Sequence, residues 1–308
     1  MTTIKLSKNN FEKVSKFILK NARKLDRRLY SFYFGNGPAD AVIESLAEYQ
    51  NADGGFGHGL EPDFRTPSSS AIATCLALQY MEKAGISEEN EALNKTMDYF
   101  SSSFSRAYGR WRPVPSDVNS YPHAPWWHLN EKTGFCGIEQ SWGNPTVEIL
   151  GYLFKYPNNF PTSQLEELIQ RTINMLLSYK GKMEEHDLYC YLSFYSHIPE
   201  ETKAKIKSIL SELILGTVNT NSKDWQTKYV PKPLQFVDDP NSPFYSLLVD
   251  SINQNLDLLI KTIDSDEAWF PTWKWTDYEE DWKKARLEWA GNIAVENLVI
   301  LKGFSRIE

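Results

Sequence analysis

Residues 43–57 read IESLAEYQNADGGFG, in which an apolar-periodic segment ends in a glutamine and runs into a glycine-rich turn with one phenylalanine. Gly54, Gly55, Gly57 and the following Gly59 allow a sharp turn, because glycine adopts backbone conformations that other residues avoid. Phe56 is the one apolar side chain of the turn, and we expect it to pack between neighbouring helices. The stretch predicts a helix that ends in an aromatic turn.

Helical spacing of apolar residues continues along the chain, and we find no convincing alternating pattern of the kind that predicts strands. Pro38 and Pro67 mark helix starts, Ser68 to Ser70 offer caps, and Asn144 before Pro145 offers a cap followed by a first-turn proline. The sequence therefore predicts an all-α protein. The expected helices lie at about 9–22, 38–50, 68–84, 89–104, 144–155, 163–179, 186–197, 200–217, 244–263 and 287–302.

The expected helices alternate in character. Those with one charged face suit an outer layer, namely 38–50, 89–104, 163–179, 200–217 and 253–263. Those that are apolar on more sides suit an inner layer, namely 68–84, 144–155, 186–197 and 289–302. A Gly-Asn-x-x-Val-Glu-x-Leu pattern also occurs twice, at 143–150 and at 291–298. Distant copies of a helical unit indicate stacked hairpins, so we expect five or six hairpins closed into one α/α toroid.

Residues 43–57 resemble the repeat shared by terpenoid cyclases and protein prenyltransferases, the squalene-cyclase repeat, in which a helix ends in glutamine before a glycine-rich aromatic turn. The resemblance covers these fifteen residues, with fainter copies elsewhere. It implies an α/α toroid (barrel) with an apolar central cavity. In FVDDP, residues 236–240, Phe236 stands where the first aspartate of a cyclase Asp-x-Asp-Asp motif would be.

Composition restricts the partners and the compartment. A net charge of −7 without a long run of lysine or arginine argues against nucleic-acid binding. No apolar stretch approaches the roughly 18 residues of a membrane span, and the N-terminal residues lack a signal-peptide core. We therefore expect a cytoplasmic protein with no membrane span, whose domain covers 1–308 and carries a lid-like insertion rich in Pro, Trp and His at about 106–143. The oligomeric state is left open.

Metal binding is not expected. Asp187, Cys190 and His197 share one helical face by spacing, and they are of the three residue types that bind zinc in protein prenyltransferases. The last two lie about 10 Å apart along a helix axis, however, which is too far for ligands that each approach zinc within about 2.0–2.3 Å. Three scattered cysteines form no other ligand pattern. We expect no metal site and no cofactor.

Loops at the mouth of a helical ring are the favoured place for a site. We expect segments 58–65, 123–142 and 269–275 to converge there, with acid–base roles for Asp63 and Glu139. Glu148 is a third candidate catalytic residue, because the first turn of an inner helix faces the central cavity. Alternatively, Glu148 and its repeat counterpart Glu296 have a structural role as hydrogen-bond acceptors. The candidate substrate-binding residues are His58, Glu61, Arg65, His123, Trp126, Trp127, His128, Trp142, Trp273 and Trp275.

The function expected first is that of a prenyltransferase-like or cyclase-like enzyme, or a descendant of one, with an apolar isoprenoid-like ligand in an aromatic cavity. The alternatives are a carbohydrate-active toroid with paired carboxylates, either a glycoside hydrolase or a lyase, and a non-catalytic binding or scaffold protein. Tryptophan faces suit both sugar rings and isoprenoid cations. The partner expected in either enzyme is a small molecule.

Overall fold

The computed structural model describes residues 4–263 and 267–308, and this part of the chain is all-helical. It contains isolated β-bridges but no β-strand within the described ranges. None of the described helices is both long and apolar enough to cross a membrane. The α-helices of these two ranges are α1 (Lys8–Asn21), α2 (Lys24–Phe34), α3 (Ala39–Leu46), α4 (Ala71–Lys83), α5 (Glu91–Ser103), α6 (Thr146–Lys155), α7 (Thr162–Ser178), α8 (Glu185–His197), α9 (Glu200–Thr217), α10 (Pro233–Phe236), α11 (Tyr245–Thr262) and α12 (Glu279–Gly303).

Contacts divide the chain into two compact units. Unit 1 comprises Met1–Pro38, Thr217–Lys274 and Glu280–Glu308, and unit 2 comprises Ala39–Gly216 and Trp275–Glu279. The five residues Trp275–Glu279 thus belong to unit 2 although the chain on both sides of them belongs to unit 1. The single domain over 1–308 and the closed ring of hairpins remain predictions.

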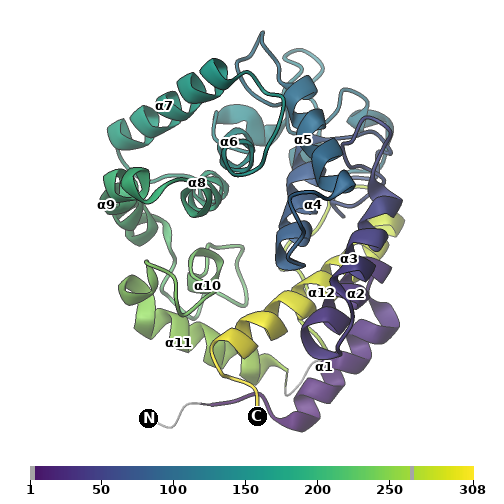
Figure 1. The fold of residues 1–308 in the computed structure, drawn as a ribbon. Helices are drawn as coiled ribbons and strands as arrows, with labels where there is room; N and C mark the ends of the chain where they lie inside the picture. Colours follow the sequence, from purple (N-terminus) through teal and green to yellow (C-terminus); the bar gives the residue numbers. More distant parts are fainter. Residues whose placement is uncertain (1–3, 264–266) are drawn as a thin grey trace. The chain divides into compact units, whose positions relative to one another are not determined.

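Unit 2 shows part of the expected alternation of inner and outer helices. Helices α6 and α8 pack against each other, with α7 and α9 outside them (Figure 1). All of the first eight residues of α6 are buried, whereas the longer α7 buries only Leu168, Thr172, Ile173 and Leu176. A helix that is apolar on most sides is stable only when neighbours cover it, and α6 fits this expectation. Helices α5 and α8, however, each bury five residues, so the full inner and outer layering stays a prediction.

Helix α4 begins where a serine cap was expected. The hydroxyl of Ser70 accepts a hydrogen bond from the backbone N–H of Ala73 at 3.0 Å. Helix α6 begins differently from the prediction, because its N-cap is Pro145 and its first helical residue is Thr146. The expected cap at Asn144 is therefore wrong.

Close approach of α6 and α8 depends on a glycine. A Cβ at Gly151 would lie 3.0 Å from the Cα of Phe194 and 3.1 Å from Nδ1 of His197. Such distances are tighter than ordinary packing allows, so a hydrogen at this position lets the two inner helices approach. This contact places polar side chains of α6 and α8 next to each other.

Unit 1 joins the two ends of the described chain. Leu6 pairs with Ile307 in a parallel bridge, and the buried Arg306 donates from Nη1 to the carbonyl of Ile4 at 2.6 Å and to Oδ1 of Asp257 at 2.8 Å. Three acceptors, including Asn253, surround this guanidinium, as a buried arginine requires. These contacts hold the N-terminal segment, α11 and the C-terminal segment together.

Two helices of unit 1 differ from the prediction. Helix α2 was not predicted, although it buries Leu25, Asp26 and Leu29. Helix α12 begins at Glu279 instead of near 287, so Asn292 lies inside the helix and is not its cap. The two copies of the Gly-Asn-x-x-Val-Glu-x-Leu pattern therefore occupy different positions in their helices.

Candidate functional site

The glycine-rich turn that follows α3 is fixed against α5. Nε2 of Gln50 donates to the carbonyl of Gly54 at 3.0 Å and to the carbonyl of Ala92 in α5 at 3.2 Å. Gly54 has φ +86°, and a Cβ there would lie 2.1 Å from the carbonyl oxygen of Lys95. Phe56 is fully buried, as expected. The turn leaves no room for a side chain at Gly54 and fixes the start of the loop 57–66.

The loop 57–66 pairs with the segment around His123. The backbone N–H of Ala124 donates to the carbonyl of Asp63 at 2.8 Å, and that of Arg65 donates to the carbonyl of Pro122 at 2.9 Å. Phe64 and His123 form the bridge between these two hydrogen bonds. Two of the loops expected to converge are thus in direct contact in unit 2.

His123 and His128 form a hydrogen-bonded pair at this junction. Nδ1 of His123 lies 2.6 Å from the carbonyl oxygen of Tyr121, and its Nε2 lies 3.0 Å from Nδ1 of His128. The two rings are nearly parallel, with centroids 5.2 Å apart. His123 is only 5% exposed, whereas His128 is exposed. The buried imidazole therefore orients the exposed one.

The partners assign the hydrogens of this pair. A carbonyl oxygen only accepts, so Nδ1 of His123 carries the hydrogen and Nε2 of the neutral ring is an acceptor. Nδ1 of His128 must then donate, which leaves Nε2 of His128 as the bare nitrogen. This Nε2 has no hydrogen-bond partner among the described residues. An oriented imidazole with a free lone pair is the arrangement of a general base.

The segment Trp275–Glu279, which we call the strap, reaches the same junction. Nε1 of Trp275 donates to Oδ1 of Asp63 at 2.8 Å, and both residues are buried. The ring of Tyr278 lies against that of His123, with centroids 5.6 Å apart. Tyr278 has φ 55°, a left-handed conformation that is uncommon for a bulky residue.

A pocket of about 650 Å³ opens at this point, and it is lined by His123, Pro125, His128, Asp277 and Tyr278. Four of these five side chains carry polar atoms. The pocket combines an oriented imidazole, a carboxylate and an exposed aromatic ring, which is a small set of convergent groups typical of a ligand site. This is the candidate active site.

Asp63 and Glu139, the two predicted acid–base residues, are not among the lining residues. The side chain of Glu139 is 1% exposed and is held by Arg112, whose Nη2 lies 3.0 Å from Oε2. Arg110 lies 3.7 Å from Oε1, and the backbone N–H of Cys136 donates to Oε2 at 3.0 Å. A buried carboxylate paired in this way fixes the insertion 106–143 in its conformation.

Glu148, the third predicted catalytic residue, lies in a polar cluster between the inner helices. Its Oε1 accepts from Nε2 of Gln79 in α4 at 2.9 Å and from the hydroxyl of Ser193 in α8 at 3.4 Å. Burial raises the pKa of Glu148, although these two hydrogen bonds oppose the rise. Both donors come from the neighbouring helices α4 and α8.

Glu82 is the second carboxylate of this cluster and has the opposite character. Its Oε1 accepts from Nζ of Lys155 at 2.6 Å, Nε2 of His197 at 2.9 Å and the hydroxyl of Tyr156 at 3.1 Å. Burial alone would raise its pKa, but the hydrogen bonds and charges of His197 and Lys155 outweigh burial and lower the pKa to about 2. The cluster thus holds one carboxyl group whose pKa is raised and one whose pKa is lowered.

The other predicted substrate-binding residues are dispersed. In unit 2, the exposed His58 contacts Oδ1 of Asn51 through Nε2 at 2.9 Å, and Trp142 donates to the carbonyl of Gly109 at 3.0 Å. Trp127 packs edge-on against Phe64 and is buried. Glu61 is buried, whereas Arg65 and Trp126 are partly exposed. Trp273 belongs to unit 1, where its ring meets those of Tyr229 and Trp289.

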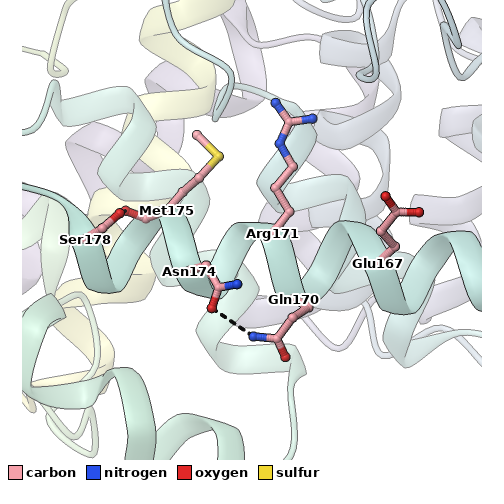
Figure 2. Close-up of a pocket in the computed structure, with 6 residues that line it drawn as sticks. All are labelled: Glu167, Gln170, Arg171, Asn174, Met175 and Ser178. Atoms are coloured by element: carbon pink, nitrogen blue, oxygen red, sulfur yellow. Dashed lines mark hydrogen bonds between the residues drawn. The ribbon is translucent and has the colours of Figure 1, made fainter.

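A second hollow runs along one face of α7. It is lined by Glu167, Gln170, Arg171, Asn174, Met175 and Ser178. Figure 2 shows that these side chains all come from successive turns of one helix, with a hydrogen bond of 2.9 Å from Gln170 to Asn174. The face has no paired acid and base, so we do not regard it as a catalytic site.

One group of possible metal ligands occurs within the described ranges. Glu184, Glu185 and His186 offer ligand atoms within 4.8 Å of one another at the start of α8. The carboxylate of Glu184 already caps this helix, because it accepts from the backbone N–H of His186 at 2.8 Å and of Asp187 at 3.1 Å. Helix capping accounts for the group without an ion.

Several residues of the candidate sites were missed in the sequence. Asp277 and Tyr278 directly follow Trp275 in WKWTDYEE, so extending that segment by a few residues would have included them. Tyr121 acts through its backbone carbonyl, which no side-chain pattern reveals. Glu82 belongs to a helix whose apolar pattern predicted only burial.

Comparison with protein-family models, with curated proteins and with solved structures finds no match to this chain.

Proposed function

We propose that this protein is an acid–base enzyme that acts on a small polar molecule in the pocket beside His128. The observation that supports this proposal most directly is the chain of hydrogen bonds from the carbonyl of Tyr121 through His123 to His128. It leaves Nε2 of His128 as a bare nitrogen on an exposed residue that lines the pocket.

In the proposed reaction, Nε2 of His128 takes a proton from a substrate hydroxyl or from a water molecule. The resulting imidazolium keeps its Nδ1–H on Nε2 of His123, so its orientation is retained. The deprotonated oxygen attacks the reacting centre of the substrate and forms the new bond, and the same Nε2 returns the proton to the leaving group as the old bond breaks. Such proton transfer contributes on the order of 10²–10⁴-fold to a rate, which suits a hydrolase.

The pocket offers hydrogen-bonding side chains that a polar substrate can use and that the isoprenoid-like ligand expected first cannot. Two imidazoles, a carboxylate and a phenol contribute polar atoms, and only Pro125 does not. We retain from the sequence the proposal of an α/α-toroid arrangement like that of terpenoid cyclases and prenyltransferases. Fold and chemistry are separable, so a polar pocket is compatible with that architecture.

The test is turnover of a panel of 4-methylumbelliferyl glycosides and esters by the wild-type protein and by His128→Gln. We expect a loss of at least 100-fold in kcat/KM in this variant, by the magnitude of general acid–base catalysis. His186→Gln is the matched control, because His186 lies on α8 outside the pocket and is paired with Glu184, the cap of that helix. Equal rates for His128→Gln and wild type would exclude the proposed role.

A long-range ¹H–¹⁵N correlation spectrum tests the arrangement of hydrogens independently of turnover. We expect both His123 and His128 to carry their hydrogen on Nδ1 in the neutral form. Substitution of His123 by Phe removes the acceptor and should return His128 to a mixture of tautomers. An Nε2–H tautomer of His128 in the wild type would contradict the proposal.

A further inference from the structure

We infer that the strap Trp275–Glu279 recognises a pyranose-type sugar, with Tyr278 as the stacking surface, Asp277 as an acceptor for sugar hydroxyls and Asp63 as a positioning residue. This inference rests on the proposed function, because it assigns a substrate class to the same pocket.

The strap is anchored at its first residue. The indole N–H of Trp275 donates to Oδ1 of Asp63 in a hydrogen bond with both side chains buried. A buried bond of this kind is costly to break, because each partner would lose its hydrogen bond away from water. Asp63 is itself tied to Ala124 through its backbone carbonyl. The anchor therefore fixes the strap relative to the segment that carries His123 and His128.

Tyr278 has the two properties of a binding surface. Its backbone φ of 55° is unfavourable for a tyrosine, and such conformations persist only where the surroundings impose them. Its ring lies against His123, and the residue as a whole is still 43% exposed. The strap thus holds an exposed aromatic ring beside the imidazole pair, at the cost of backbone strain.

The chemistry of the pocket fits a sugar. One face of a pyranose ring presents C–H groups that pack on an aromatic ring, while its hydroxyls donate to carboxylates and imidazoles. Asp277 and Tyr278 supply the acceptor and the ring, and His128 supplies the base at the same pocket. An isoprenoid chain has no hydroxyl donors for Asp277. Orientation of a hydroxyl toward Nε2 of His128 is what the proposed proton transfer requires.

Isothermal titration calorimetry with xylo-, cello-, manno- and chito-oligosaccharides tests the inference, with farnesyl diphosphate as the apolar probe. We expect at least one oligosaccharide series to bind and farnesyl diphosphate not to bind. Tyr278→Phe should keep the affinity, whereas Tyr278→Gly and Asp277→Asn should weaken it by on the order of tenfold.

Glycine at position 278 makes this test independent of folding. It removes the ring but relieves the left-handed backbone strain, so the variant should unfold at the same or a higher urea concentration than wild type. Ser305→Gly is the matched control, because Ser305 has the same φ of 55° in the C-terminal segment of unit 1. Absence of binding by every oligosaccharide series, or equal binding by wild type and Tyr278→Gly, would overturn the inference.

Two variants of Asp63 separate positioning from catalysis. Asp63→Ala removes the acceptor for Trp275 and should weaken sugar binding, while Asp63→Asn retains an acceptor oxygen and should restore most of it. If Asp63 were instead a catalytic carboxylate, both Asp63→Ala and Asp63→Asn should lose turnover. If sugar binding depends on the strap but His128→Gln keeps full turnover, only the acid–base proposal fails. If His128→Gln is inactive but the strap variants bind sugar normally, only the strap inference fails.

Discussion

Replacing Glu82 by glutamine should remove much of the acid sensitivity of unit 2. The Glu82 carboxylate accepts hydrogen bonds from Lys155, Tyr156 and His197, which join α4 to α6 and α8. Its side chain is 22% exposed, so solvent screens these interactions only in part. Glutamine keeps the shape and one acceptor oxygen but cannot carry the charge, so the helices should still pack.

The magnitude follows from the pKa of Glu82, which falls from an ordinary 4.5 to about 2 in the folded protein. Because one pKa unit corresponds to about 1.4 kcal/mol, the charged form contributes roughly 3 kcal/mol to the free energy of unfolding at pH 7. A lowered pKa contributes stability that is present above 4.5 and is lost as the pH falls toward 2. More than half of this contribution, by the same relation, should be gone at about pH 3.

Urea unfolding of wild type and Glu82→Gln at a series of pH values between 7 and 3 measures this contribution. We expect the two proteins to differ most at pH 7 and to converge as the pH falls. Glu201→Gln is the control, because Glu201 pairs with Lys205 on α9 with its side chain 84% exposed, and an ion pair so exposed to solvent contributes little. A difference between wild type and Glu82→Gln that is the same at pH 7 and pH 3 would refute the argument.

Three further changes have definite outcomes. Gly54→Ala should destabilise the protein by several kcal/mol, because its Cβ would lie 2.1 Å from a backbone oxygen. Gly85→Ala, at a residue with φ +70° and no atom within 4 Å of a Cβ, should cost only about 1 kcal/mol. Urea midpoints compare the two variants, and equal losses of stability would contradict the role of close packing at Gly54. Glu148→Gln should become more stable relative to wild type as the pH rises. The reason is that a carboxyl of raised pKa contributes stability that is present below its ordinary pKa and is lost as the pH rises through the folded value. A difference in unfolding free energy that does not change with pH would contradict this. Ser70→Ala should cost about 1 kcal/mol through loss of the α4 cap. Ser70→Asp should not recover this loss fully, because Ser70 is buried and a carboxylate there would be desolvated. Thermal unfolding of both variants checks this, and an unaffected Ser70→Ala would show that the cap is dispensable.

The helical fold was largely predictable because its signals are local. Helix α9 occupies the predicted residues 200–217, and the burial of α6 follows from the apolar residues on all its sides. Helix α12 was predicted too short because its first turns, EEDWKKAR, carry many charges and few apolar residues. Charge obscured the helix there, since intrinsic propensity is a weaker signal than apolar periodicity.

The site was less predictable because it depends on contacts between distant residues. His123 and His128 were selected as unusual residues of a long loop, but their hydrogen bond and its backbone anchor at Tyr121 depend on how the loop folds back on itself. Asp63 was chosen as an acid, yet the indole of Trp275, 212 positions away, occupies one of its oxygens. Sequence spacing carries no information on such a pairing.

The way unit 1 is assembled from the chain has a consequence for its formation during synthesis. The backbone of Lys8 donates to the side chain of Glu308, 300 positions later, and the neighbouring Leu6 pairs with Ile307. While a ribosome extends the chain, the N-terminal segment is therefore made about 300 residues before the partners that it contacts, whereas 39–216 of unit 2 is made as one continuous stretch. At roughly 5–20 residues per second, the N-terminal segment remains without these contacts for about 15–60 seconds, during which its apolar side chains are exposed to chaperones and proteases.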